Sequence, residues 1–482
     1  MCATQENEQM TEFKKYIQMK LKISFYLLII LFVLQSCQEK QSVDPKLEGV
    51  WNSIGYGHQV IIDDSSIMIY DTYKNGCILN MELPKSFIED YYEVTKLTSD
   101  SLEIKLGFTK YDFIRSTSKS GVCQENSVDD NPISNFDALW HTFNENYSSF
   151  NLRGIDWEKM KEKYRPKLNA QSTDLELNSV LTEMISELKD GHVSIQKPES
   201  LEDEIGANGT DNNGLRELVI SKINSKYLDS VKTYNKGNIN WGMINSKIGF
   251  IQINDFEDLA NYQIDENLST EEFWNEYWKK AGESENYPKE VLSSFKKQLA
   301  TIFDDIKNTQ VCIIDIRFNW GGFDQAGLEV LSYFTNKKKI AFSKKARFQH
   351  GFTEEQSIYI TPNKNQYAGN LYLLTSHQTA SASETFALAS LNLSNAKKIG
   401  SNTAGIFSDI LSKKLPNGWE YTLSNEIYES VDGINYERIG IPADYKIDYS
   451  EKTTKFYNNL LEEIKTRGDR AIEKVIELNS KK

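Results

Sequence analysis

Apolar and polar residues follow a strand-like pattern between residues 47 and 118. Short runs of alternating character, such as 67–70 and 102–106, are separated by Asp, Ser, Gly and Asn residues at hairpin spacing. A period of two is typical of strands that bury one face. We therefore expect a small antiparallel β module over residues 47–118, and no residue in it has catalytic character.

A helical pattern replaces this alternation after a polar stretch at residues 118–132. Thr173 and Glu176 have the spacing of a capping box, and apolar residues then recur every three or four positions. This predicts an amphipathic helix that leads into the sequence Asp190-Gly191-His192. We expect residues 132–195 to form a helical subdomain.

Apolar runs and helical segments alternate through residues 245–450. Buried strands are predicted at 311–314 and 371–374, each followed by a helix that starts near Asp324 and Ala382 respectively. This order predicts an α/β core. The chain between His192 and this core is too short for a PDZ domain, and residues 451–482 have the pattern of one or two closing helices.

The N-terminal segment has the features of a bacterial export signal. An apolar run at 23–33 follows Lys20 and Lys22, is too short to cross a bilayer comfortably, and ends before Cys37. Residues 34–37 resemble the lipobox of bacterial lipoproteins, in which the cysteine is acylated. Residues 1–37 are thus predicted to be an N-terminal extension and a lipoprotein signal peptide, and translation is expected to start at Met19. The resemblance implies that the signal peptide is cleaved before Cys37, which becomes the lipidated first residue of the mature chain. Residues 38–46 then form a tether.

Export places the chain in the cell envelope, anchored to a membrane by lipid at Cys37. Gln38 stands where an inner-membrane retention signal often has aspartate, so the outer membrane is favoured, with the face left open. In that oxidising compartment Cys77 and Cys123 could pair, whereas Cys312 lies in an apolar run and is expected to be buried.

Charge and residue spacing exclude two classes of function. The net charge is -14, and the basic residues do not gather into a stripe along the sequence. Such a chain repels phosphate backbones, so binding to nucleic acid is not expected. The cysteines do not have the spacing of zinc ligands, and no metal or cofactor is implied.

One candidate catalytic segment lies between a predicted strand and a helix. Residues 375–384 read Thr-Ser-His-Gln-Thr-Ala-Ser-Ala-Ser-Glu, with Ser381 at the start of the helix. A serine in this position projects from a rigid edge, and amides at the positive end of the helix dipole can stabilise an oxyanion. Alone, the segment equally fits an N-cap serine on a core helix.

A second segment ends the preceding strand in a glycine pair. Residues 313–322 read Ile-Ile-Asp-Ile-Arg-Phe-Asn-Trp-Gly-Gly. Glycine lets a backbone amide face a bound carbonyl without obstruction, so this turn could supply another oxyanion donor. Asp315 and Arg317 could brace it by a salt bridge.

Together the two segments resemble the S41 peptidases, the tail-specific or C-terminal processing proteases. The resemblance implies an α/β catalytic core of the ClpP/crotonase type, with Ser381 as the nucleophile. It also implies oxyanion amides from Ala382 and from Gly321 or Gly322. Many members of that family pair the serine with a lysine, but this chain has Ile406 at the corresponding position.

Isoleucine cannot act as a base, so the resemblance shifts to another branch of the family. That branch is similar to the tricorn core protease and to interphotoreceptor retinoid-binding protein, and uses a histidine and a late glutamate. His192 and Glu437 match those positions, although Glu426, Glu429 or Asp444 could replace Glu437. An imidazole can take and return the serine proton while a carboxylate fixes its tautomer.

Other candidate bases fit less well. His377 lies on the turn before Ser381, where its side chain is poorly placed to reach the hydroxyl, and Lys413 and Lys414 are predicted on a following strand. His58, His141 and His350 belong to no matching motif.

The expected function is a serine endopeptidase that acts on a peptide or protein substrate through an acyl-enzyme. Two alternatives use the same fold. One is a catalytically inactive lipoprotein that binds a ligand or peptide, and the other is an esterase. The sequence does not separate a peptidase from an esterase.

Overall fold

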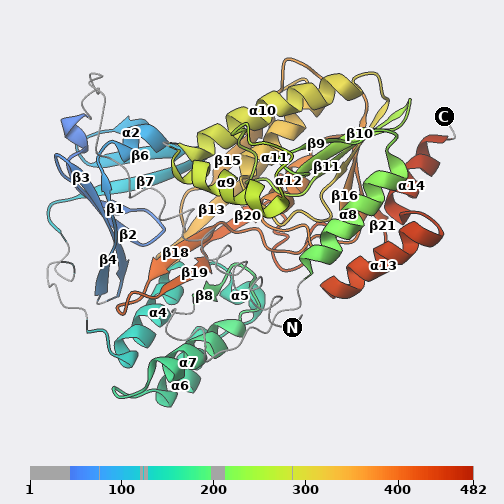
Figure 1. The fold of residues 1–482 in the computed structure, drawn as a ribbon. Coiled ribbons are helices and arrows are strands. Elements are labelled where there is room, and N and C mark those ends of the chain that lie inside the picture. The colour runs from blue at the N-terminus through green and yellow to red at the C-terminus, as the bar shows by residue number, and fades with distance from the viewer. Residues whose placement is uncertain are drawn as a thin grey trace.

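The computed structural model describes residues 44–74, 76–119, 123, 129–196, 212–284 and 286–480. Cys37 and the expected signal peptide lie outside these residues. In the described ranges, no helix is both long and apolar enough to cross a membrane. The fold is a mixed α/β arrangement, which confirms the predicted class (Figure 1).

The N-terminal strands form one antiparallel sheet. In spatial order they are β4 (Gly76–Pro84), β3 (Ser66–Tyr73), β2 (His58–Ile62), β1 (Gly49–Ser53), β7 (Thr109–Ser116), β6 (Ser101–Leu106) and β5 (Glu93–Leu97). The short helices η1 (Pro45–Leu47) and α2 (Phe87–Tyr91) flank it. One face buries a cluster around Trp51 and Phe113, as the alternating pattern predicts.

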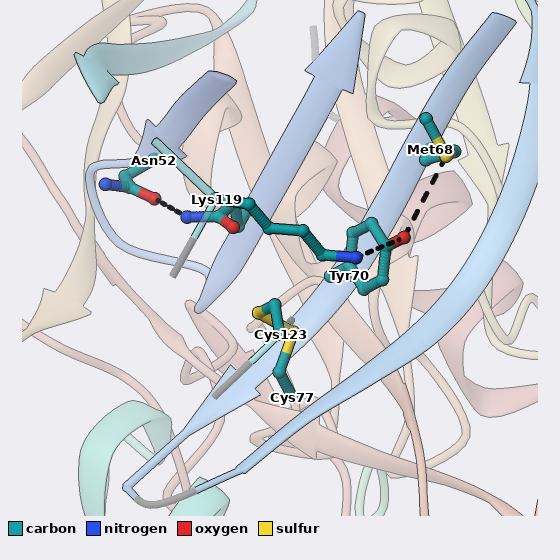
Figure 2. The surroundings of a disulfide bond; sticks show 7 residues. Asn52, Met68, Tyr70, Cys77, Lys119 and Cys123 are labelled. Carbon is teal, nitrogen blue, oxygen red and sulfur yellow. Dashed lines mark hydrogen bonds between the residues drawn. A yellow bond between two sulfur atoms is a disulfide. The ribbon is translucent and has the colours of Figure 1, made fainter. Parts of the chain in front are cut away.

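A disulfide connects this sheet to the segment that follows it. Cys77 on β4 is bonded to Cys123, and Tyr70 nearby accepts a hydrogen bond from Lys119 (Figure 2). The pairing that the sequence left open is therefore present. Cys312 is buried, as expected.

Helices after the disulfide pack into a second body. They are α4 (Pro132–Asn146), α5 (Phe150–Arg153), α6 (Trp157–Tyr164), η2 (Arg165–Lys167) and α7 (Asp174–Ser186). The capping box of α7 is formed by Thr173 and Glu176, as predicted. The apolar faces of these helices share a core with Leu411 and Tyr421 of the later chain, so the helices are packed onto the α/β part.

A seven-stranded sheet forms the centre of the α/β part. In order its strands are β21 (Tyr445–Lys446), β17 (Ala396–Gly400), β16 (Asn370–Thr375), β12 (Val311–Asp315), β11 (Ile248–Ile253), β10 (Ile239–Asn245) and β9 (Lys232–Tyr234). From β11 to β21 the strands are parallel, and β10 and β9 are antiparallel.

Helices cover both faces of this sheet. Along β12, Cys312 and Ile314 face one core and Val311 and Ile313 face the other, which explains why the strand is continuously apolar. The first face carries α9 (Thr270–Gly282), α10 (Tyr287–Ile306), α11 (Asp324–Leu331) and α12 (Ala382–Ser390). The second carries α8 (Asn213–Tyr227), α13 (Thr453–Thr466) and α14 (Arg470–Ser480).

Two small sheets connect the three bodies. One contains β14 (Gly351–Phe352), β13 (Lys339–Phe348), β15 (Gln356–Ile360) and β20 (Glu426–Glu429), and η4 (Ser332–Phe334) precedes it. The other contains β18 (Ile410–Lys414), β19 (Glu420–Ser424) and β8 (Ser194–Ile195). Because β8 begins two residues after His192, its pairing with β19 fixes the histidine loop on the α/β part.

A buried ion-pair cluster holds β12 to the C-terminal helices. Arg317 forms two contacts with Asp315, at 2.9 and 2.7 Å, and a third at 2.8 Å with Asp469, the residue before α14. All three side chains are fully buried. Burial lowers the pKa of Arg317, but the two carboxylates outweigh it and hold that pKa well above its usual range. The predicted Asp315–Arg317 salt bridge is confirmed.

We predict that Arg317→Met destabilises the protein by about 3–5 kcal/mol, because it leaves two carboxylates buried without a counter-ion. The measurement is urea unfolding of a chain that begins at Asp44. The control is Lys446→Met, since Lys446 pairs with Asp448 at an exposed site and its loss should cost less than about 1 kcal/mol. Equal effects of the two substitutions would contradict this interpretation.

Candidate active site

Ser381 occupies a strained turn between β16 and α12. It has φ of 56° and ψ of -126°, a combination that residues other than glycine rarely adopt, and its side chain is half-buried. Its amide donates to the carbonyl of Ile406 at 2.9 Å. This turn therefore places Ser381 at the half-buried start of a buried helix, as in a nucleophile elbow.

The glycine turn lies directly against this serine. A Cβ atom on Gly321 would come within 2.7 Å of the Cβ of Ser381, and φ of Gly321 is 126°. Both the close approach and the backbone angle require glycine here. The turn predicted from sequence is therefore brought to Ser381.

Two main-chain amides near Ser381 have no hydrogen-bond acceptor among the described residues. Gly321 donates its N–H to Oδ1 of Asn319 at 2.9 Å, whereas the amides of Gly322 and Ala382 have no hydrogen-bond partner among the described residues. Ala382 is the first residue of α12, where amides are free of intrahelical bonds. Of the two glycines, Gly322 is the one with an available donor.

Asn319 ties the glycine turn to the helix that carries Ser381. Its Oδ1 also accepts a hydrogen bond from Ser383 Oγ at 2.5 Å, and its main-chain carbonyl accepts from Ala380. Its Nδ2 donates to the carbonyl of Ile253 on β11. One buried amide side chain thus fixes the relative position of three elements.

The segment 403–408 lies beside Ser381 and is held by Glu384. The carboxyl group of Glu384 accepts hydrogen bonds from Gly405 and Ile406 at 2.8 and 2.5 Å. Burial raises the pKa of Glu384 to about 8, although these bonds and one from Thr403 favour its charged form. Glu384 therefore fixes this segment and does more than cap its own helix.

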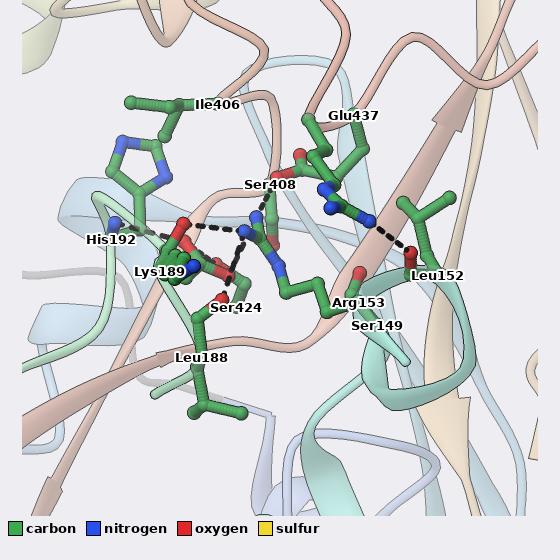
Figure 3. A network of polar contacts seen from close by, with 12 residues as sticks. Ser149, Leu152, Arg153, Leu188, Lys189, His192, Ile406, Ser408, Ser424 and Glu437 are labelled. Atoms are coloured by element: carbon green, nitrogen blue, oxygen red, sulfur yellow. Dashed lines mark hydrogen bonds and ion pairs between the residues drawn. The ribbon is translucent and has the colours of Figure 1, made fainter. Parts of the chain in front are cut away.

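His192 lies against the same segment. A Cβ atom on Gly191 would lie 2.5 Å from the terminal methyl of Ile406, so the histidine loop approaches this side chain closely, and His192 lies beside Ile406 in Figure 3. The His192 ring hydrogen-bonds to the main chain of Ser408, and its Nδ1 has no partner among the described residues. Ile406, which replaces the expected lysine, thus lies beside His192 and binds Ser381 through its carbonyl.

The environment of His192 favours a neutral imidazole. Burial lowers the pKa of His192, and the nearby Asp190 and the hydrogen bond to Ser408 oppose that shift. No hydrogen bond joins the ring to Ser381 within the described residues, and each of the two residues bonds to the segment 403–408. Catalytic hydrogen bonds often tighten only when substrate binds.

Asp190 positions the histidine loop. Its Oδ1 accepts from the amide of His192 at 3.0 Å and from Ser424 at 3.1 Å, and its Oδ2 accepts from Tyr147 at 2.8 Å. Asp190 thereby joins α4, the histidine loop and β19. Its motif was noted in the sequence, but its part in the site could not be predicted because both side-chain partners are distant in the chain.

Glu437 reaches the site through Arg153. The Arg153 guanidinium contacts Glu437 at 2.5 Å and Asp190 at 3.3 Å, and Glu437 accepts from the amide of Phe407 at 2.9 Å (Figure 3). Burial and Asp190 raise the pKa of Glu437 to about 7. No described hydrogen bond connects Glu437 to the His192 ring, so its role as the orienting acid stays a prediction. Arg153 belongs to no motif and was missed.

The alternative acids bind elsewhere. Glu426 contacts Lys344 at 3.1 Å, Glu429 contacts Lys345 at 2.8 Å, and Asp444 accepts hydrogen bonds from Lys398. None of them has a described contact with His192.

The alternative bases also face other parts of the molecule. His377 packs edge-on against Phe456 of α13. Lys413 binds Asp71 and the carbonyl of Gly57, and Lys414 donates to the carbonyl of Asn80, so both lysines attach β18 to the N-terminal sheet. Within the described ranges no group of His, Cys, Asp and Glu side chains could hold a metal ion.

Three solved structures can be aligned with about 70% of this chain. A candidate peptidase from Parabacteroides merdae has 19% identity and a TM-score of 0.50, and the match covers 71% of this chain and 99% of that one. Mature CPAF has 12% identity, a TM-score of 0.47 and coverage of 70% and 96%. The photosystem II D1 C-terminal processing protease has 14% identity, a TM-score of 0.41 and coverage of 72% and 100%.

Family models match two segments of the sequence. Residues 130–186 match the tricorn protease C1 domain, which corresponds to the helices before His192. Residues 247–447 match peptidase family S41, and this range contains Ser381, the glycine turn and Glu437. The α/β part of this chain is therefore similar to the S41 peptidases, and the helical part before it is similar to the tricorn protease.

Proposed function

We propose that this chain is a serine endopeptidase with Ser381 as its nucleophile and His192 as its general base. The observation that carries the proposal is the strained, half-buried Ser381 at the start of α12, beside two amides without partners. The match of residues 247–447 to family S41 supports a peptidase.

In the proposed reaction, Ser381 Oγ attacks the carbonyl carbon of the scissile peptide bond while His192 takes the hydroxyl proton. The amides of Gly322 and Ala382 bind the oxyanion. The C–N bond then breaks, and His192 gives its proton to the departing amine. Water then attacks the acyl-enzyme while His192 takes its proton, and His192 returns that proton to Ser381 Oγ as the ester C–O bond breaks and the acid leaves.

Arg153, Asp190 and Glu437 position His192 in this proposal. Asp190 holds the main chain of His192, and Arg153 links Asp190 to Glu437. Glu437 binds the amide of Phe407. The residue before it, Ile406, contacts Ser381, and the residue after it, Ser408, contacts the His192 ring. The network thus keeps the base on the segment that bonds to the nucleophile through the Ile406 carbonyl.

We also propose that lipid at Cys37 anchors the protein to a membrane of the cell envelope, with the outer membrane favoured. The support is the basic, apolar and small-residue order before Cys37 and the disulfide between Cys77 and Cys123, which suits an oxidising compartment.

We predict that Cys37→Ser releases the protein from the membrane fraction, because the acylated residue is lost. The measurement is fractionation of cells that express the full chain, with Cys312→Ser as the control since Cys312 is buried in the core. Unchanged membrane association of Cys37→Ser would exclude this anchor.

We predict that Ser381→Ala lowers kcat/KM for peptide hydrolysis by at least about a thousandfold, since the nucleophile is removed. The matched control is Ser390→Ala on the same helix, where the hydroxyl only bonds to the carbonyl of Ala387. Turnover is measured with a library of quenched fluorescent peptides and the chain from Asp44 onward. Similar turnover in the two variants would refute the nucleophile assignment.

We predict that the pH profile of kcat/KM has an acidic limb with its midpoint below 6.5, the ordinary pKa of histidine. Because burial lowers the pKa of His192, the imidazole stays neutral and active as a base to lower pH. His192→Gln should remove this limb together with most of the activity, and His141→Gln should retain both. A limb that persists in His192→Gln belongs to another group and removes His192 from the proposal.

A further inference from the structure

A cavity of about 480 Å³ lies between the N-terminal sheet and the α/β part. Most residues on its sheet side are apolar and alternate along the strands, among them Trp51, Val60, Ile69, Met81, Leu102 and Ile104, and Ser53, His58 and Asn80 add polar groups. Cavities of about 300–1,000 Å³ with this apolar character are typical of ligand sites. The inner face of the sheet is thus only partly covered by protein.

The opposite wall belongs to the α/β part and adjoins the candidate active site. Trp278 and Tyr287 come from α9 and α10, which lie beside the sheet in Figure 1. Phe323 follows Gly322, and Asp409 follows Ser408, the residue whose main chain binds His192. The cavity wall therefore continues from both of the segments that surround Ser381.

Acidic groups lie at one side of the cavity. Glu426 accepts hydrogen bonds from Tyr56 and Lys344, and Asp409 contacts the same ammonium at 3.3 Å. Lys344 is almost fully buried, so two carboxylates share one enclosed cation. This charge balance disfavours an anionic head group and permits a neutral apolar group.

An open strand edge distinguishes a peptide from a lipid occupant. At the end of the β18–β19 pair, the amide of Leu415 donates to the carbonyl of Trp419. The amide of the preceding Lys414 points away from β19 and donates to the carboxylate of Asp71. By alternation, the main-chain groups of Ile410 and Ser412 also point away from β19, and no partner for them is described. Both residues line the cavity. An extended peptide could satisfy these groups, whereas a lipid chain could not.

We propose that this cavity binds large apolar side chains of the polypeptide substrate next to the bond held at Ser381. The proposal rests on the peptidase function given above and adds a substrate class to it. The sheet that forms half of the cavity, β1 to β7, lies outside both family matches, at residues 130–186 and 247–447. The N-terminal sheet would then set the substrate preference of a catalytic core of common type.

The test measures binding in a Ser381→Ala background, so it does not depend on turnover. The probe is N-phenyl-1-naphthylamine, a neutral dye that fluoresces in apolar sites. Ile104→Trp fills the cavity from β6, and Ile114→Trp is the matched control because Ile114 is 52% exposed on the neighbouring strand β7 and does not line the cavity. We expect Ile104→Trp to weaken probe binding by about tenfold or more and Ile114→Trp to leave it unchanged.

Competition then identifies the occupant. A peptide with adjacent Leu and Phe residues should displace the probe, and a peptide of equal length with Ser at those positions should not. Equal probe binding by Ile104→Trp and Ile114→Trp would overturn the cavity assignment. Displacement by a long-chain alcohol but not by the apolar peptide would overturn the peptide occupant. If Ser381 proves not to be the nucleophile, these binding results are unaffected, so the two failures are distinguishable.

Discussion

The carboxyl group of Glu384 holds the segment on which the candidate active site depends. It accepts the amides of Gly405 and Ile406 inside the protein, where an unpaired amide would be costly. That segment presents the Ile406 carbonyl to Ser381, the Phe407 amide to Glu437 and the Ser408 main chain to His192. Nucleophile, candidate base and candidate acid are therefore placed by one short stretch of main chain.

Docking of the helical part completes this arrangement. His192 belongs to the loop after α7, and the contacts that fix it come from β19, Asp190 and Arg153. Arg153 lies between two buried carboxylates, so its removal would leave both of them without a counter-ion. The same network makes the position of His192 sensitive to how the helices pack, which connects folding to the proposed chemistry.

Local patterns in the sequence predicted the features that depend on neighbouring residues. Three features were predicted in this way: the capping box at Thr173, the salt bridge between Asp315 and Arg317, and the glycine turn. Within each feature, the residues involved are only a few positions apart. The strand, small-residue turn and helix around Ser381 equally fit an N-cap serine, so Ser381 was selected by the resemblance of its segment and the glycine turn to the S41 peptidases. In each case, the chain has little freedom to bring different partners together.

Long-range contacts could not be predicted in this way. Glu437 matches a late glutamate in sequence, but its partner Arg153 lies in a short helix without a motif. Lys413 reads as a possible base, although its ammonium binds Asp71 of the N-terminal sheet. The cavity could not be predicted either. A strand whose face lines a cavity has the same apolar alternation as a strand whose face is fully covered by protein.

The central claim is that Ser381 is an activated nucleophile served by His192. The most direct test is mass-spectrometric mapping of the chain from Asp44 onward after reaction with a fluorophosphonate, which forms a stable bond with an activated serine. We expect one adduct, on Ser381, that forms much more slowly in His192→Gln. An adduct on another residue, or folded protein that remains unmodified, would contradict it.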